Sequence, residues 1–152
     1  MYTRLIAPLF CVAAIVFACG PRPHQTADAL PLPTAKKFDA PPIASTMTVR
    51  VGDAVVLALH VTNNTDKQLE INFPSGQTHD FRVLDPSGRE VWRWSQGRLF
   101  TQSLQNKLLA AGETLTYEEQ WKAPDLHGPL VAVATLKSSD HPVETRVEFS
   151  LP

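Results

Sequence analysis

Apolar residues recur at every second position in a series of short runs along this chain. Between Val55 and Val61, for example, every second residue is a valine or a leucine. Such alternation places these side chains on one face of a β-strand. The pattern predicts strands at residues 47–51, 55–61, 69–73, 80–84, 90–94, 115–121, 130–136 and 143–149, and a loop leading into a short strand that ends near Leu109.

Turn-forming residues separate these runs. Glycine, proline, asparagine and aspartate gather at residues 52–53, 63–66, 85–88, 111–113 and 127–129. They favour tight turns through positive φ angles, a fixed φ angle or side-chain bonds to the backbone. Many short strands with regular turns, and no convincing amphipathic helical pattern, predict an all-β antiparallel β-sandwich over residues 46–152.

One of the predicted turns joins a hairpin of special interest. Residues 85–88 (Asp-Pro-Ser-Gly) suit a type I turn between the strands at 80–84 and 90–94. A four-residue loop would place Phe81 opposite Trp92. A three-residue loop with a glycine bulge would instead place the two tryptophans of the second strand opposite Asp80 and Arg82.

The two tryptophans, Trp92 and Trp94, are two residues apart and therefore share one face of their strand. Large aromatic side chains supply much of the buried area of a small core. We therefore expect at least one of them in the core, and we expect Trp92 to be substantially buried.

The first 18 residues have the features of a secretory signal. A short positive end is followed by an apolar run, residues 5–17, that is too short to span a bilayer comfortably. The residues Val16-Phe17-Ala18-Cys19 resemble a bacterial lipobox. That resemblance implies cleavage before Cys19 and acylation at Cys19, and several acyl chains would give stable anchoring.

The predicted mature protein is therefore a lipoprotein of the bacterial cell envelope. Its membrane is the outer one where the source has one, because Gly20 lacks the acidic character associated with inner-membrane retention. Removal of the signal also removes Cys11 and leaves a single cysteine, so no intrachain disulfide is expected. Six prolines within residues 19–45 predict an extended tether between the anchor and the domain.

Charge and the scatter of reactive residues argue against several functions. The chain has 14 basic and 15 acidic residues, which leaves no basic field to bind nucleic acid. Its five histidines are dispersed, so no metal or cofactor is expected. Ser75, His79 and Asp80 lie within one loop, but that spacing does not predict triad geometry, and we assign no catalytic residues and no enzymatic activity.

Several motifs together resemble those of one known family. They are SGQ at residues 75–77, DF at 80–81, VWRWS at 91–95, FTQ at 100–102 and AGE at 111–113, followed by Tyr117 and Trp121. In this combination they are similar to the BsuPI-type intracellular proteinase inhibitor domain, over roughly residues 55–121. The resemblance implies an immunoglobulin-like β-sandwich and the inhibition of serine proteinases.

The residues of this resemblance gather in and near two segments, which we predict to form a surface that binds a protein partner. The candidate contact residues are Ser75, Gly76, Gln77, His79, Asp80, Arg93, Ser95 and Arg98. Two functions remain open. An envelope inhibitor would insert a rigid loop, 74–80 or 95–100, into the active site of a protease. A non-inhibitory immunoglobulin-like adaptor would instead use a broad face or a free edge strand.

Overall fold

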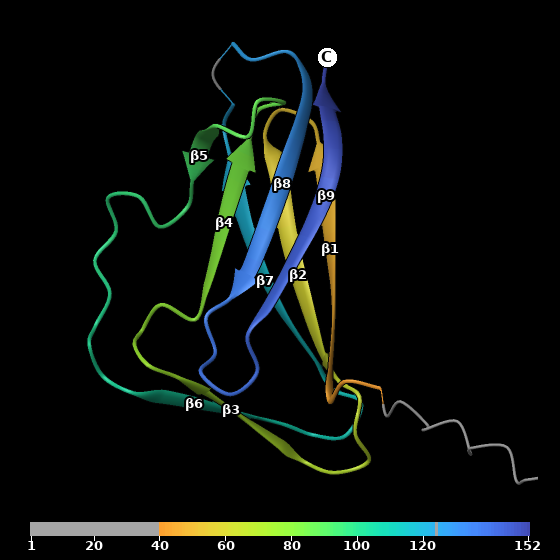
Figure 1. Cartoon of the computed structure of the whole chain (residues 1–152), viewed down its shortest axis with the longest axis vertical. Coiled ribbons are helices and arrows are strands. Elements are labelled where there is room, and N and C mark those ends of the chain that lie inside the picture. Colours follow the sequence, from red (N-terminus) through yellow and green to blue (C-terminus); the bar gives the residue numbers. More distant parts are fainter. Residues whose placement is uncertain (1–39, 124) are drawn as a thin grey trace, which may run out of the picture. The chain divides into compact units, whose positions relative to one another are not determined.

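The computed structural model describes residues 40–123 and 125–152 (Figure 1). The predicted signal peptide, Cys19 and most of the predicted tether lie outside these residues. The described part is all-β, and its strands pair antiparallel. The strands are β1 (Ile43–Val51), β2 (Val55–Asn63), β3 (Leu69–Phe73), β4 (His79–Leu84), β5 (Glu90–Arg93), β6 (Gln105–Leu109), β7 (Thr114–Trp121), β8 (Gly128–Leu136) and β9 (Val143–Leu151). This confirms each predicted strand, including the short strand that ends at Leu109.

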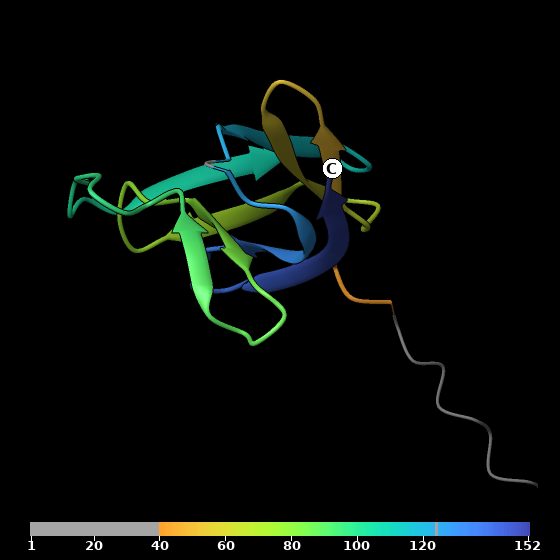
Figure 2. The same cartoon turned by 90° about the horizontal axis from the view of Figure 1, so that it is seen from above.

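The strands form two layers and a separate ribbon. One layer has the order β1-β2-β7 and the other the order β5-β4-β8-β9, while β3 and β6 pair with each other. Figure 2 shows the two layers edge on, and Figure 1 shows the β3-β6 ribbon crossing one end of the domain. The arrangement confirms an all-β antiparallel sandwich. The immunoglobulin-like topology that the family resemblance implies stays a prediction.

The core lies between the two layers because the alternating residues of each sheet face inward. In β2, Leu57, Leu59 and Val61 are buried, and in β4 Phe81 and Val83 are buried. Burying one such side chain contributes about 1.5–3 kcal/mol. Of the residues of β2 that face away from the core, His60 and Thr62 form side-chain hydrogen bonds to Thr116 and Thr114 of β7.

The first strand begins before the boundary predicted from the sequence. Residues 43–45, which the sequence pattern places at the end of the tether, belong to β1 and pair with the end of β2. Ile43 is buried in the core, and Pro42 accepts a backbone hydrogen bond from Asn64 at 2.9 Å. The sandwich therefore starts directly after the two prolines at 41 and 42.

Both hairpin registers considered above are wrong. Trp92 lies opposite Val83, and Glu90 lies opposite Leu84, so Val91 is an extra residue in its strand. The loop itself is the three-residue alternative: it closes between the Asp85 N–H and the Arg89 carbonyl at 2.9 Å, Gly88 has a φ of 83°, and the Asp85 carboxylate accepts backbone hydrogen bonds from Ser87 and Arg89. The bulge at Val91 then shifts Trp92 and the residues that follow by one position from that register.

The two tryptophans differ in burial. Trp94 is 9% exposed, which confirms that at least one of the pair belongs to the core. Trp92 is half-buried and stacks on Trp121 of β7, with 5.6 Å between ring centroids. Trp92 therefore joins the two layers at the edge of the core, and Trp94 is the more deeply buried of the two.

A buried amide links two turns at the end of the sandwich. Asn63 is fully buried, and its Nδ2 lies within hydrogen-bond distance of the carbonyls of Lys67, Leu109 and Ala110. Its Oδ1 accepts from the backbone and the hydroxyl of Thr65, at 2.9 and 2.7 Å. This one side chain joins the turn after β2 to the end of β6.

We predict that Asn63→Ala lowers the free energy of unfolding by about 3 kcal/mol, because a buried polar group that loses its partner costs about 1–3 kcal/mol. Urea denaturation monitored by tryptophan fluorescence measures this loss. The matched control is Asn64→Ala, which truncates an exposed side chain of the same type and should change stability little. Equal midpoints for the two variants would contradict the role given to Asn63.

Candidate functional site

A stack of three rings connects the two layers beside the end of β5. His79 lies between Trp94 and Tyr117, with 4.3 Å between its ring centroid and each of theirs and interplanar angles of 27°. Trp94 follows β5 directly, and its N–H donates to the carbonyl of Phe81 at 2.9 Å. The stack therefore fixes the point where the chain leaves the sheet.

His79 is held in an environment that disfavours its charged form. It is 7% exposed, and burial lowers the pKa of its imidazole from the ordinary value of 6.5. Glu119, 3.4 Å from Nε2, opposes this by hydrogen bonding and charge, whereas the nearby Arg98 guanidinium lowers the pKa further. The remaining ring nitrogen, Nδ1, lies 3.2 Å from the hydroxyl of Thr78.

A buried carboxylate fixes the first residue after Trp94. Asp80 is 1% exposed and accepts from Nε of Arg93 at 2.8 Å. It also accepts from the backbone N–H and the hydroxyl of Ser95, at 3.3 and 2.9 Å. These bonds balance the cost of burying the charge. They hold the beginning of the 95–104 segment against β4.

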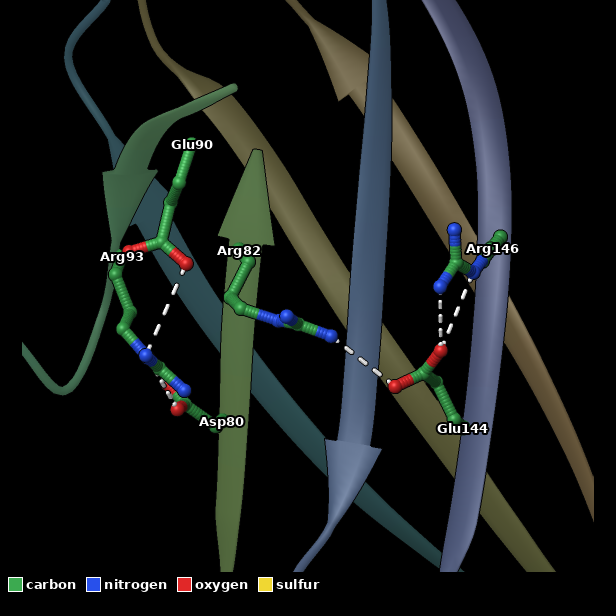
Figure 3. A network of polar contacts seen from close by, with 6 residues as sticks. All are labelled: Asp80, Arg82, Glu90, Arg93, Glu144 and Arg146. Atoms are coloured by element: carbon green, nitrogen blue, oxygen red, sulfur yellow. Dashed lines mark hydrogen bonds and ion pairs between the residues drawn. The ribbon is translucent and has the colours of Figure 1, made fainter. Parts of the chain in front are cut away.

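Asp80 belongs to a network of ion pairs on the outer face of the β5-β4-β8-β9 sheet (Figure 3). Arg82 and Arg93 lie opposite each other on β4 and β5, a pairing of like charges that by itself destabilises a sheet. Arg93 is neutralised by Asp80, and Arg82 by Glu144 at 3.1 Å. Arg146 also pairs with Glu144, at 2.9 Å. The network therefore stabilises the sheet, and it occupies Arg93.

The two segments predicted to form one surface lie side by side. The Gly76 N–H donates to the carbonyl of Thr101 at 2.9 Å. A Cβ atom on Gly76 would lie 2.6 Å from the Thr101 hydroxyl oxygen, closer than real Cβ contacts, so this approach requires glycine. Within the same loop, the Ser75 hydroxyl accepts from the Gln77 N–H at 3.2 Å. The 75–78 loop is half-buried and supports the 95–104 segment.

The 95–104 segment forms the outermost loop on one side of the domain (Figures 1 and 2). It opens with a turn in which the Arg98 N–H donates to the Ser95 carbonyl at 3.1 Å, and Gly97 has a φ of 75°. Within this segment, Leu99 is 101% exposed and Leu104 84% exposed. Leu108 of β6, close to the end of the segment, is also exposed.

The candidate contact residues therefore separate into three groups by burial. His79 and Asp80 are buried, so the structure places these two side chains inside the domain and not at its surface. Both side chains are buried although they are polar, because each has hydrogen-bonding partners within the fold. Arg98 is exposed, whereas the other residues are half-buried or bonded within the domain: Ser75, Gly76, Gln77, Arg93 and Ser95.

Sequence reasoning missed the exposed leucines. Leu99 and Leu104 lie in a stretch without periodicity, where an apolar residue has no predicted core face. The available signals were the position of Leu99 just after the turn at Gly97 and the position of Leu104 between two polar residues. Each is an apolar side chain that no strand pattern buries.

Two further features, a metal site and a membrane-spanning helix, are absent from the described part of the chain. Within residues 40–123 and 125–152, no group of three His, Cys, Asp or Glu side chains could hold a metal ion. His79 faces Glu119 and Thr78, and the Ser75 hydroxyl is bonded within its own loop. The same two ranges contain no helix long and apolar enough to cross a membrane.

Comparisons with known proteins agree with the motifs. The family model described as "BsuPI: Intracellular proteinase inhibitor" matches residues 43–141. No curated protein matches the chain.

Three solved structures are similar to the chain at low identity. The yjhA protein from Bacillus subtilis is 16% identical with a TM-score of 0.41, over 74% of this chain and 94% of that one. The putative ApaA protein from Bordetella pertussis is 18% identical with a TM-score of 0.38, over 72% and 91%. A b-glucosidase from Erythrobacter marinus, EmGH1, is 16% identical with a TM-score of 0.38, over 70% of this chain and 15% of that one.

We predict that the His79 imidazole titrates below 6.5 in the folded protein. The unfolded chain then binds a proton that the folded chain does not, so stability falls as pH drops below about 6.5. Histidine NMR shifts measure the pKa directly, and urea unfolding at several pH values measures the slope. Glu119→Gln removes one of the two carboxylate charges that raise the pKa, while Asp80 keeps the other, and the variant should lower the pKa further. A folded-state pKa at or above 6.5 would contradict the assignment.

Proposed function

We propose, from the premise that the chain belongs to the BsuPI family of intracellular proteinase inhibitors, that it binds a serine proteinase and blocks its active site with the 95–104 segment. The family supports an inhibitor-like, non-catalytic role. We choose the 95–104 segment because it is exposed and because its first residues are held against the sandwich by hydrogen bonds.

An inhibitor must present a loop whose shape is set before binding, because ordering a mobile loop on contact costs affinity. The base of the 95–104 segment is held by Asp80, by the Trp94 ring and by the bond from Gly76 to Thr101. Of the two loops considered from the sequence, 74–80 is half-buried and lies beneath this segment. The segment after Trp94 is therefore the better choice for entering a cleft.

The proposal includes a location. Acylation at Cys19 would fix the protein to the bacterial envelope, with the outer membrane as the destination where the source has one. The prolines between the anchor and Ile43 would then separate the domain from the lipid surface. A proteinase partner would accordingly be one that reaches the envelope.

An adaptor is a second candidate, favoured by the edge of β6. The Asn72 N–H donates to the Asp140 carboxylate, and the Asn72 carbonyl accepts from the Ser139 N–H. Both backbone groups of Asn72 therefore point away from β6. Its partner across the ladder, Asn106, must then point away from β3 as well, and so must Leu108 two residues on. Within the described residues these groups make no backbone hydrogen bond, and an extended peptide could add to this edge.

We expect the purified full-length protein to inhibit at least one member of a serine proteinase panel at a one-to-one ratio. Residues 43–151 should survive the encounter uncut, because the held segment resists the motion that cleavage requires. Residual activity during titration and intact-mass analysis of the mixture give the two measurements.

A separate variant tests whether a partner strand adds to the edge of β6. Asn106→Pro removes an outward N–H without removing a β3-β6 hydrogen bond, so it should abolish strand addition and leave proteinase inhibition unchanged. Absence of inhibition across the panel, together with an extended ligand whose binding is lost in Asn106→Pro, would replace the inhibitor proposal by the adaptor.

We expect Cys19→Ser to release the protein from membranes or to leave it unprocessed, because the thiol would carry the lipid. Membrane fractionation and mass spectrometry of the mature N-terminus measure the result. Cys11→Ser is the matched control and should leave anchoring unchanged. A mature chain that begins elsewhere and lacks a lipid would contradict the anchor.

A further inference from the structure

In the exposed segment, one side chain projects outward between two neighbours that both contact the Trp94 ring. The Arg98 guanidinium lies 4.5 Å from the centroid of the Trp94 ring, and the Phe100 ring centroid lies 5.5 Å from it. Leu99, between them, is 101% exposed. Its side chain therefore projects into solvent while both neighbours contact the same buried ring.

The backbone around Leu99 is held from both sides. Before it, Nε of Arg98 donates to the Trp94 carbonyl at 2.9 Å. After it, the Thr101 carbonyl accepts from Gly76 at 2.9 Å. A fully exposed apolar side chain contributes nothing to the core, but in a fixed position it can bind a partner with little loss of conformational freedom.

The other exposed leucines lack this setting. Leu104 is 84% exposed, but its neighbours Ser103 and Gln105 are exposed too and pack against no ring. Leu108 lies within β6 and is more covered, at 57% exposure. Leu108 also has packed neighbours, because Lys107 Nζ lies 5.6 Å from the centroid of the Tyr117 ring and Leu109 is buried. Of the leucines exposed in the described residues, Leu99 is the most exposed, and it lies in a loop with a neighbour against the Trp94 ring on each side.

Resting on the proposed function, we infer that Leu99 is the side chain that enters the primary specificity pocket of the target. That pocket would be apolar and of a size that accepts leucine. A pocket with an acidic residue at its base selects arginine or lysine instead. The adjacent Arg98 does not supply this charge, because its guanidinium is committed to the ring and the carbonyl of Trp94.

The test exchanges the chemistry of this one side chain. Leu99→Arg should lose at least about tenfold in inhibition of proteinases with an apolar pocket and should gain inhibition of trypsin, since a specificity pocket discriminates by complementary charge and shape. Leu104→Arg is the matched control: it adds the same charge to another exposed leucine of the segment and should leave the preference unchanged. Equal melting temperatures show that all three proteins fold alike.

The outcomes separate this inference from the proposed function. If the wild type inhibits and Leu99→Arg keeps the same preference, or is only cut by trypsin without inhibiting it, Leu99 is not the anchor and the inhibitor function stands. If the wild type inhibits no panel member but Leu99→Arg inhibits trypsin, Leu99 is the anchor and the natural target lies outside the panel. If none of the three proteins inhibits any proteinase, both proposals fail.

Discussion

The ring of Trp94 is shared between the core and the surface, and the arrangement of the site depends on it. It stacks with His79 inside the sandwich, and it contacts Arg98 and Phe100 of the exposed segment. Its indole Nε1 makes no hydrogen bond to any described residue, so the faces of the ring and not its N–H decide where it lies. Because the imidazole is buried between rings and away from water, its charged form is disfavoured and the pKa of His79 is lowered.

The strands could be predicted from the sequence because period-two alternation records which face of a sheet is buried. The hairpin register could not, because it depends on the bulge at Val91, which shifts Trp92 by one position after a loop that the sequence does indicate. The burial of His79 and Asp80 was also beyond the pattern, since such residues are mostly exposed when unpaired. Their partners include Glu119, about forty positions further along, which only the assembled sandwich brings near.

Two buried polar side chains hydrogen-bond connecting segments to the strands, which apolar residues could not do. Asn63 joins the turn after β2 to the end of β6, and Asp80 joins β4 to Arg93 and to Ser95. Each lies where a strand gives way to a loop, and each satisfies backbone or charged donors that would otherwise be buried without partners. Apolar packing decides that a sandwich forms, whereas these two groups decide where its connecting segments lie.

Most of the motif residues that indicate the family hold the base of the exposed 95–104 segment in place. Gly76 allows the close approach to Thr101, Asp80 holds Ser95, and Trp94 carries Phe100. Leu99 lies between the VWRWS and FTQ motifs and belongs to neither. A rigid support with an independent residue at its exposed position can present different side chains without a change of fold. Under the proposed function, the support is the part that the family motifs describe, and the residue at position 99 is the part that would set the target.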